Sequence, residues 1–216
     1  MTTEIERIVT ANHPEQINFT EMYVTHDALR RDLARMAEAA AAGRADAPKV
    51  LDGWATFKRQ LDVHHGVEDA WLWPNLKKHL ADRPDDLALL DAMEAEHSVI
   101  DPQLAAVDAA VAAGSDEVAA RVEELASALD HHLTHEEVAA LPLIQSVMTV
   151  REWGGFRLAM GRRQKLSGAA EWVPWIIDGM TPDDARRWLQ RFPPPLRMMN
   201  RLFWEGRYRG RDLWSY

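Results

Sequence analysis

Two stretches of the sequence repeat one pattern of residues that could bind metal ions. In each, a glutamate follows a histidine by four residues and a proline follows the glutamate by six. The first copy contains His64, Glu68 and Pro74, and the second contains His132, Glu136 and Pro142. A further histidine precedes each copy, His26 by 38 residues and His97 by 35. Because imidazole nitrogens and carboxylate oxygens ligate transition metals, the copies predict the two halves of one polynuclear metal site.

The composition restricts both the metal and the type of protein. The 216 residues include no cysteine, which excludes thiolate zinc sites, iron–sulfur clusters and disulfides. Nitrogen and oxygen donors alone suit iron, manganese or zinc. The sequence has no apolar run long enough to span a membrane and no export signal at Met1, so we expect a globular, cytoplasmic protein.

Four helical segments account for the first 150 residues. The expected helices span residues 14–42, 47–80, 84–114 and 115–151. Pro14 suits a first helical turn, Gly43 a C-terminal stop and Ser115 an N-cap. Connections this short make neighbouring helices antiparallel. The predicted fold is therefore an all-α, up-down-up-down four-helix bundle, followed by a helical extension.

Each expected helix carries a stripe of residues at the three- and four-residue spacing of a buried helix face. The stripes consist of Phe19, Met22, His26, Leu29, Leu33 and Met36; Trp54, Phe57, Leu61, His64, Glu68 and Trp71; Leu90, Met93, His97, Ile100, Leu104, Val107 and Val111; and Val118, Val122, Leu125, Leu129, His132, Glu136, Ala139 and Leu143. They are apolar except at the repeated histidines and glutamates. Because a buried carboxylate without a partner is costly, two of them beside four histidines predict a dinuclear metal centre.

The other five histidines are expected outside the ligand set. His65, His131 and His135 lie off the stripes or on their flanks. Of these, only His135 is close enough to serve as an extra ligand or as a hydrogen-bond donor beside the ligands. His13 and His79 fall near helix ends, where we expect them in solvent.

Prolines interrupt the helical patterns at three positions. Pro74, Pro102 and Pro142 each remove a backbone hydrogen bond, so each should kink or end its helix. Two interpretations stay open. The prolines either simply terminate helices, or the bends shape the mouth of a pocket near the ligands.

The charge balance changes sign near Arg151. Residues 1–150 carry 12 Lys and Arg against 27 Asp and Glu, whereas residues 151–216 carry 13 against 7 and contain six of the nine tryptophans. We therefore divide the chain into an acidic bundle (1–150) and a basic, tryptophan-rich extension (151–216). In the extension, Thr181 should begin a helix over residues 184–192, and a last helix should span 196–207 after three prolines.

Three interpretations of the extension stay open. The apolar segment 172–177 favours docking on the acidic bundle or on a second subunit, as a lid or dimer element. Arginines beside tryptophan and phenylalanine would also suit a membrane surface. Nucleic-acid binding is disfavoured because the whole chain is acidic, with a net charge of −9.

As a set, the motifs of residues 15–150 resemble the hemerythrin-like (HHE cation-binding) family. The motifs are His26-Asp-Ala-Leu, His64-His-x-x-Glu68-Asp, Glu96-His97-x-x-Ile100 and His132-x-x-x-Glu136-Glu. The resemblance implies a four-helix bundle around two non-haem iron ions joined by an oxo or hydroxo bridge. The implied iron ligands are His26, His64, Glu68, His97, His132 and Glu136, with the two glutamates as bridges. Glu137 and Asp69 would then lie beside the ligands or in solvent.

One position departs from the oxygen-carrying hemerythrins, which have a five-histidine site with two histidines one turn apart on the third helix. Here the positions one turn from His97 are Met93 and Asp101. An oxygen donor from Asp101, Glu94, water or Tyr23 would complete the site instead. Such a donor favours the ferric state and oxidative chemistry over reversible oxygen carriage.

The sequence therefore supports one functional hypothesis and leaves two other classes of function open. We expect a non-haem di-iron protein that binds, senses or detoxifies oxygen, peroxide or nitric oxide. The alternative is a di-iron oxidase or oxygenase of a small organic substrate, with Trp54, Phe57, Trp71 and Met93 as the pocket wall. An iron-dependent regulator acting through the extension is a third class. Neither turnover nor a particular redox partner is predicted.

Overall fold

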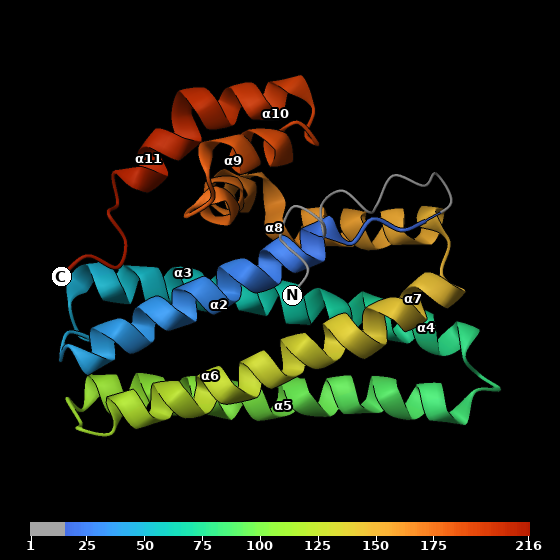
Figure 1. Cartoon of the computed structure of the whole chain (residues 1–216), viewed down its shortest axis with the longest axis horizontal. Coiled ribbons are helices and arrows are strands. Elements are labelled where there is room, and N and C mark those ends of the chain that lie inside the picture. The colour runs from blue at the N-terminus through green and yellow to red at the C-terminus, as the bar shows by residue number, and fades with distance from the viewer. Residues whose placement is uncertain (1–15) are drawn as a thin grey trace.

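The computed structural model describes residues 16–216, and all regular secondary structure in this part of the chain is helical. Four long helical rods lie side by side in two rows, and the C-terminal helices pack on one of these rows (Figure 1). Successive rods are joined at alternate ends of the molecule. The predicted all-α fold is thus confirmed for residues 16–216.

The four rods follow the expected order. They are α2 (Thr20–Ala41); α3 (Pro48–Val67), η1 (Glu68–Leu72) and α4 (Trp73–His79); α5 (Pro84–Ala112); and α6 (Val118–His135), η2 (Glu136–Ala140) and α7 (Leu141–Val147). Gly43 and Gly114 follow α2 and α5 with φ of 66° and 59°, a left-handed conformation that glycine adopts without strain. The predicted N-cap Ser115 lies two residues before the N-cap of α6, which is Glu117, although its hydroxyl accepts the N–H of Glu117 at 3.1 Å as a capping serine would. Pro14 lies outside the described residues.

The two repeated prolines do not terminate their rods. A five-residue π-helical turn, η1 or η2, begins at the glutamate of each copy. In each turn, the residue before the proline donates its N–H to the carbonyl of that glutamate, Trp73 to Glu68 and Leu141 to Glu136. Proline lacks an N–H and its ring clashes with the carbonyl four residues earlier, so the wider turn accommodates it. Pro102 lies inside α5, which continues on both sides.

Each π turn changes which residues face the core. The expected stripes continue through Trp71 and Ala139, but both are only half-buried. The fully buried residues come one or two positions later, as Leu72 and Trp73 in one rod and Ala140 and Leu141 in the other. The extra residue of a π turn rotates the following helix by about 100°, which explains the shift.

The extension contains more helix than the sequence predicts. Its elements are α8 (Val150–Ile177), α9 (Pro182–Leu189), α10 (Pro194–Met199), η3 (Asn200–Trp204) and α11 (Glu205–Arg209). The predicted start at Thr181 is confirmed, since its hydroxyl accepts the N–H of Asp184 at 3.2 Å. The long helix α8 was not expected. It consists of two helical parts that meet at Lys165, whose φ is 57°.

The tryptophans of the extension are directed inward. Trp153, Trp175, Trp188, Trp204 and Trp214 are buried, and Trp172 is half-buried. The Nε1 of Trp175 donates to Asp32 of α2 at 2.6 Å, and Arg31 donates to the carbonyls of Trp175 and Asp178 at 3.0 and 2.6 Å. The apolar segment 172–177 therefore docks on the bundle.

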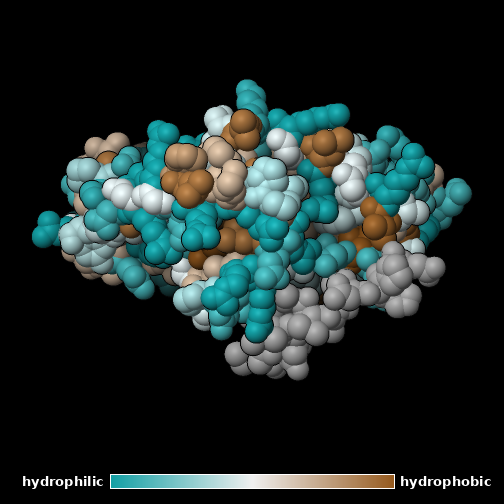
Figure 2. Space-filling model, turned by 90° about the horizontal axis from the view of Figure 1, so that it is seen from above, coloured by the Kyte–Doolittle hydropathy of each residue, from teal (hydrophilic) through white to brown (hydrophobic). Residues whose placement is uncertain are grey.

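Figure 2 shows the face of the molecule on which the extension lies. Hydrophilic residues cover most of this face, and hydrophobic residues form separate small areas. Large apolar side chains that the extension exposes include Met198, Leu202 and Phe203. Within residues 16–216, no helix is long and apolar enough to cross a membrane.

We predict that Asp32 is important for holding the extension on the bundle. Asp32→Ala leaves the indole N–H of Trp175 and the guanidinium of Arg31 without their buried acceptor, and should lower the free energy of unfolding by about 3 kcal/mol. Asp62→Ala is the control. It removes an ion pair with Arg163 of α8, but Asp62 is 71% exposed, so the loss should stay below about 1 kcal/mol. Urea unfolding measures both, and equal losses would contradict the prediction.

Candidate metal centre

All four rods contribute to one buried group of polar side chains. The six predicted ligands, His26, His64, Glu68, His97, His132 and Glu136, are all buried and lie near the middle of the bundle. The residues one turn away on one side belong to one hydrophobic cluster, namely Leu29, Leu61, Ile100 and Leu129. On the other side, Met22, Leu72, Met93 and Ala140 belong to a second cluster. The polar group thus separates two apolar cores.

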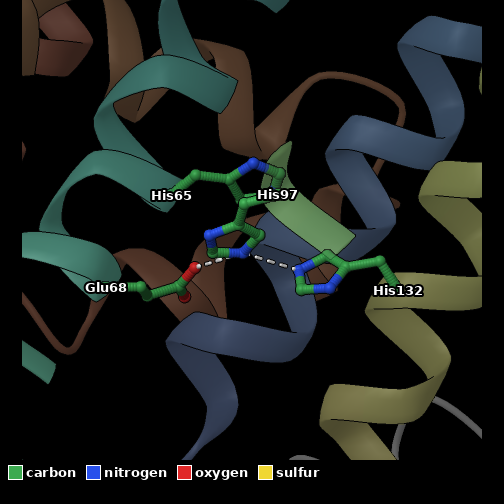
Figure 3. Close-up of side chains that lie close together, drawn as sticks. All are labelled: His65, Glu68, His97 and His132. Atoms are coloured by element: carbon green, nitrogen blue, oxygen red, sulfur yellow. Dashed lines mark hydrogen bonds and ion pairs between the residues drawn. The ribbon is translucent and has the colours of Figure 1, made fainter. Parts of the chain in front are cut away.

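One part of this group contains three histidines and a glutamate. His65, Glu68, His97 and His132 each place a ligand atom within 4.8 Å of the others (Figure 3). The Nε2 atoms of His97 and His132 are 3.0 Å apart, and Glu68 Oε2 lies 3.7 Å from His97 Nε2. The His65 ring stacks on that of His97, with centroids 3.9 Å apart.

The other part contains His26, His64 and Glu136. The Nε2 atoms of His26 and His64 are 3.0 Å apart, and Glu136 Oε2 lies 3.1 Å from His26 Nε2. Glu68 reaches this part as well, because its Oε1 lies 3.3 Å from His64 Nε2. Each part mixes residues of both sequence copies, and Glu68 lies between the two.

The polar atoms in the centre fit a pair of metal ions. Both carboxylate oxygens of Glu68 and of Glu136, and Nε2 of His65, are buried without a hydrogen-bond partner among the described residues. Two ligand atoms that bind one ion at about 2.1 Å and at right angles are about 3 Å apart, which matches the two Nε2 pairs. A cation would supply the partner that these buried atoms lack.

Carboxylates outside the centre orient three of the histidines. His26 Nδ1 pairs with Glu137 at 2.9 Å, His97 Nδ1 with Asp69 at 2.7 Å, and His132 Nδ1 with Glu96 at 2.9 Å. Because a carboxylate accepts the Nδ1 proton, Nε2 keeps a free lone pair toward the centre. Glu137 and Asp69 therefore lie beside the ligands. The role of Glu96 was not predicted from the sequence.

A chain of charges connects His26 with the surface. Burial lowers the pKa of His26, but Glu136 and Glu137 outweigh it and raise the pKa to about 9. Burial raises the pKa of Glu137, but His26 and Arg30 outweigh it and lower the pKa to about 2. Arg30 binds Glu137 at 2.7 Å and also binds the exposed Asp130 at 2.7 Å.

Burial is the largest cause of the pKa shifts of four other central groups, Glu68, His64, His65 and His132. It raises the pKa of Glu68 well above its usual range, and the nearby Glu136 adds to the effect. Burial also lowers the pKa of His64 and His65 well below the usual value, and that of His132 to about 3. Near neutral pH, the protein groups alone therefore keep His26 protonated and His132 neutral, while burial favours the uncharged forms of Glu68, His64 and His65.

The expectation that His65 lies off the ligand face is wrong. His65 is buried in the centre, three residues before Glu68 and therefore on the same helix face. It places a fifth imidazole in the centre, whereas the positions one turn from His97 hold no histidine. The equivalent residue of the second copy is the buried Leu133, so the two halves are not identical.

Two of the residues considered as replacements for a fifth histidine nitrogen, Asp101 and Glu94, lie elsewhere. Asp101 is exposed, Glu94 binds Lys77 at 2.9 Å, and Tyr23 packs against the second hydrophobic cluster. His135 binds Glu96 at 2.8 Å on the outer side of His132 and is not among the central ligands. Two further histidines lie outside the centre, since His131 is exposed and His79 pairs with Glu152 near the surface. His13 precedes the described residues.

Comparison with known proteins places this arrangement in a family. No curated protein and no solved structure matches the chain significantly. The hemerythrin HHE cation-binding domain matches residues 19–144, which include all the central histidines and both central glutamates. The chain therefore belongs to the hemerythrin HHE cation-binding family.

Proposed function

We propose that this protein holds two iron ions in its bundle and uses them to bind dioxygen, peroxide or nitric oxide. We also propose that the four rods of the bundle have an up-down-up-down arrangement. The observation that carries the proposal is the pair of adjoining ligand groups with Glu68 in reach of both. His26, His64 and Glu136 would hold one ion, and His65, His97 and His132 the other, with Glu68 as a bridge.

The choice of iron rests on the donors and on the family. Imidazole nitrogens with carboxylate oxygens and no thiolate suit iron, manganese or zinc, and we propose iron because the chain belongs to the hemerythrin family. Iron supplies electrons and open coordination positions for a small ligand. The protein contributes the orientation of the imidazoles through Glu137, Asp69 and Glu96, and two apolar clusters that limit water around the centre.

The nitrogen count supports binding or sensing over consumption of the small ligand. The four histidines of the apolar stripes would leave one ion with an oxygen donor, which favours the ferric state. His65 fills that deficit within the group of His97 and His132. We also propose that residues 1–150 form the metal-binding domain, that residues 151–216 serve as its accessory, and that the protein acts in the cytoplasm.

We predict about two metal ions per chain in the protein as isolated, measured by elemental analysis. His64→Ala and His97→Ala each remove a nitrogen from a different group and should each lower the metal content clearly. His79→Ala is the matched control, because His79 is partly exposed and pairs with Glu152. Absence of metal from the parent protein, or equal metal content in all variants, would overturn the proposal.

We predict that metal uptake displaces a proton from His26. Glu136 and Glu137 raise its pKa to about 9, so His26 is protonated at neutral pH and must lose its proton to bind a cation, and burial also raises the pKa of Glu68. The affinity for Zn²⁺ should therefore rise between pH 6 and 7.5, by about tenfold per pH unit for each proton displaced. Calorimetry in buffers of different ionisation enthalpy counts the protons released. An affinity independent of pH would contradict this assignment.

We predict that oxygen binding to the reduced protein is reversible and depends on His65. Stopped-flow mixing with oxygen should give an absorption change that disappears when oxygen is removed. His65→Leu gives the first sequence copy the residue that the second copy has, Leu133, and should shift the reaction toward permanent oxidation. Permanent oxidation of the parent protein would instead support the oxidase or oxygenase alternative.

A further inference from the structure

A cavity of about 210 Å³ lies between the bundle and the extension. Its lining is mainly apolar and comes from both parts of the chain, with Met22 and Val63 on the bundle side and Trp153, Phe156, Trp172 and Phe192 on the extension side. His64 is the one central ligand that lines it. Trp54, Phe57, Trp71 and Met93, the pocket wall expected under the oxidase or oxygenase alternative, do not line this cavity.

The other polar side chains at the cavity are already paired. The Thr25 hydroxyl donates to the carbonyl of Glu21 at 2.7 Å. Arg157 binds the carboxylate of Glu21 through two nitrogens at 2.7 and 2.8 Å. Gln164 Nε2 donates to Gln60 Oε1 at 2.7 Å. A molecule in the cavity would therefore meet apolar surface and few free polar groups.

His64 is the exception. The Nδ1 atoms of His26, His97 and His132 each contact a carboxylate, whereas Nδ1 of His64 is buried and has no hydrogen-bond partner among the described residues. With Nε2 turned toward the ligand group, Nδ1 carries the proton and acts as a donor. The histidine that lines the cavity is thus the one of these four whose outer donor lacks an acceptor.

We propose that this cavity binds a small, mainly apolar aromatic molecule that offers one hydrogen-bond acceptor to Nδ1 of His64. A dry cavity of about 150 Å³ accommodates benzene, so the volume here suits one ring with one or two small substituents. The rings of Trp153, Phe156 and Trp172 favour an aromatic partner through edge and stacking contacts.

This binding site gives the extension a specific role. Without α8 and the segment that follows it, the cavity would have only the wall formed by α2 and α3. A bound molecule that accepts a hydrogen bond from His64 would also orient that imidazole, as Glu137, Asp69 and Glu96 do for the other three. This proposal rests on the proposed metal centre in one respect: Nε2 of His64 faces the metal ions, which leaves the proton on Nδ1. Binding in the cavity is measured separately from the metal content.

The test uses the full chain and two probes, p-cresol and toluene, which differ in one hydroxyl group. Calorimetric titration should show saturable binding of one p-cresol per chain. In the zinc-loaded protein, the Nδ1 proton resonance of His64 should shift with p-cresol and remain in place with toluene. Failure of both probes to bind up to their solubility would overturn the proposal, even if the metal content is as expected.

Two glycines of α8 provide a matched pair of variants. A Cβ at Gly161, which lines the cavity, or at Gly154, which does not, would meet no atom within 4 Å. Gly161→Leu should therefore fill the cavity and weaken p-cresol binding at least tenfold, while Gly154→Leu should leave it within twofold. Ala169→Leu, at another position of the lining, should act like Gly161→Leu. Unchanged affinity in both cavity variants would place the probe elsewhere and overturn the proposal.

Discussion

The burial of two carboxylates in the middle of a helical bundle is the constraint on which the rest of the structure depends. Glu68 and Glu136 are fully buried, and none of their oxygens has a hydrogen-bond partner among the described residues. Such a layer is unfavourable unless positive charge compensates it. The histidines around the glutamates, the outer acids that orient these histidines, and the apolar cluster on either side all fit a bound cation pair. The same burial favours the protonated form of Glu68, whereas Glu136 and Glu137 hold the proton on His26.

The two halves of the centre are similar but not equivalent. Both glutamates begin a π turn, and in both the following proline makes a regular turn unfavourable. The halves differ next to the histidine, where His65 in one copy corresponds to Leu133 in the other. They also differ in surroundings, because His26 connects through Glu137 to Arg30, whereas His132 connects through Glu96 to His135. Two ions in this centre would therefore experience different donors and different charges.

The sequence predicts the framework well, because helical periodicity and the repeat both depend on short-range spacing. All six residues predicted as ligands lie in the core, and the four rods follow the predicted order. The errors fall mainly at helix ends, such as the start of α6 near Ser115. The burial of His65 in the centre was not predicted, because a residue next to His64 falls at the edge of a stripe drawn through His64. The three-residue spacing from His65 to Glu68 could have indicated it. Trp71 was misplaced since a π turn has no simple sequence pattern. The bend at Lys165 and the pairing of Glu96 with His132 depend on tertiary contacts that spacing does not encode.

The sequence leaves several interpretations open for the extension: docking on the bundle or on a second subunit, or contact with a membrane surface. The packing of its tryptophans favours docking on the bundle. Its tryptophans are buried or half-buried, so the aromatic content serves largely to dock basic helices on an acidic bundle. Asp32, inside the bundle, receives both the indole of Trp175 and the neighbouring arginine, which fixes the second part of α8. The first part of α8 is held at Glu21 by Arg157, and the bend at Lys165 separates the two. Between these attachments the helix does not close fully on α2 and α3, and the space left over is the cavity that reaches His64.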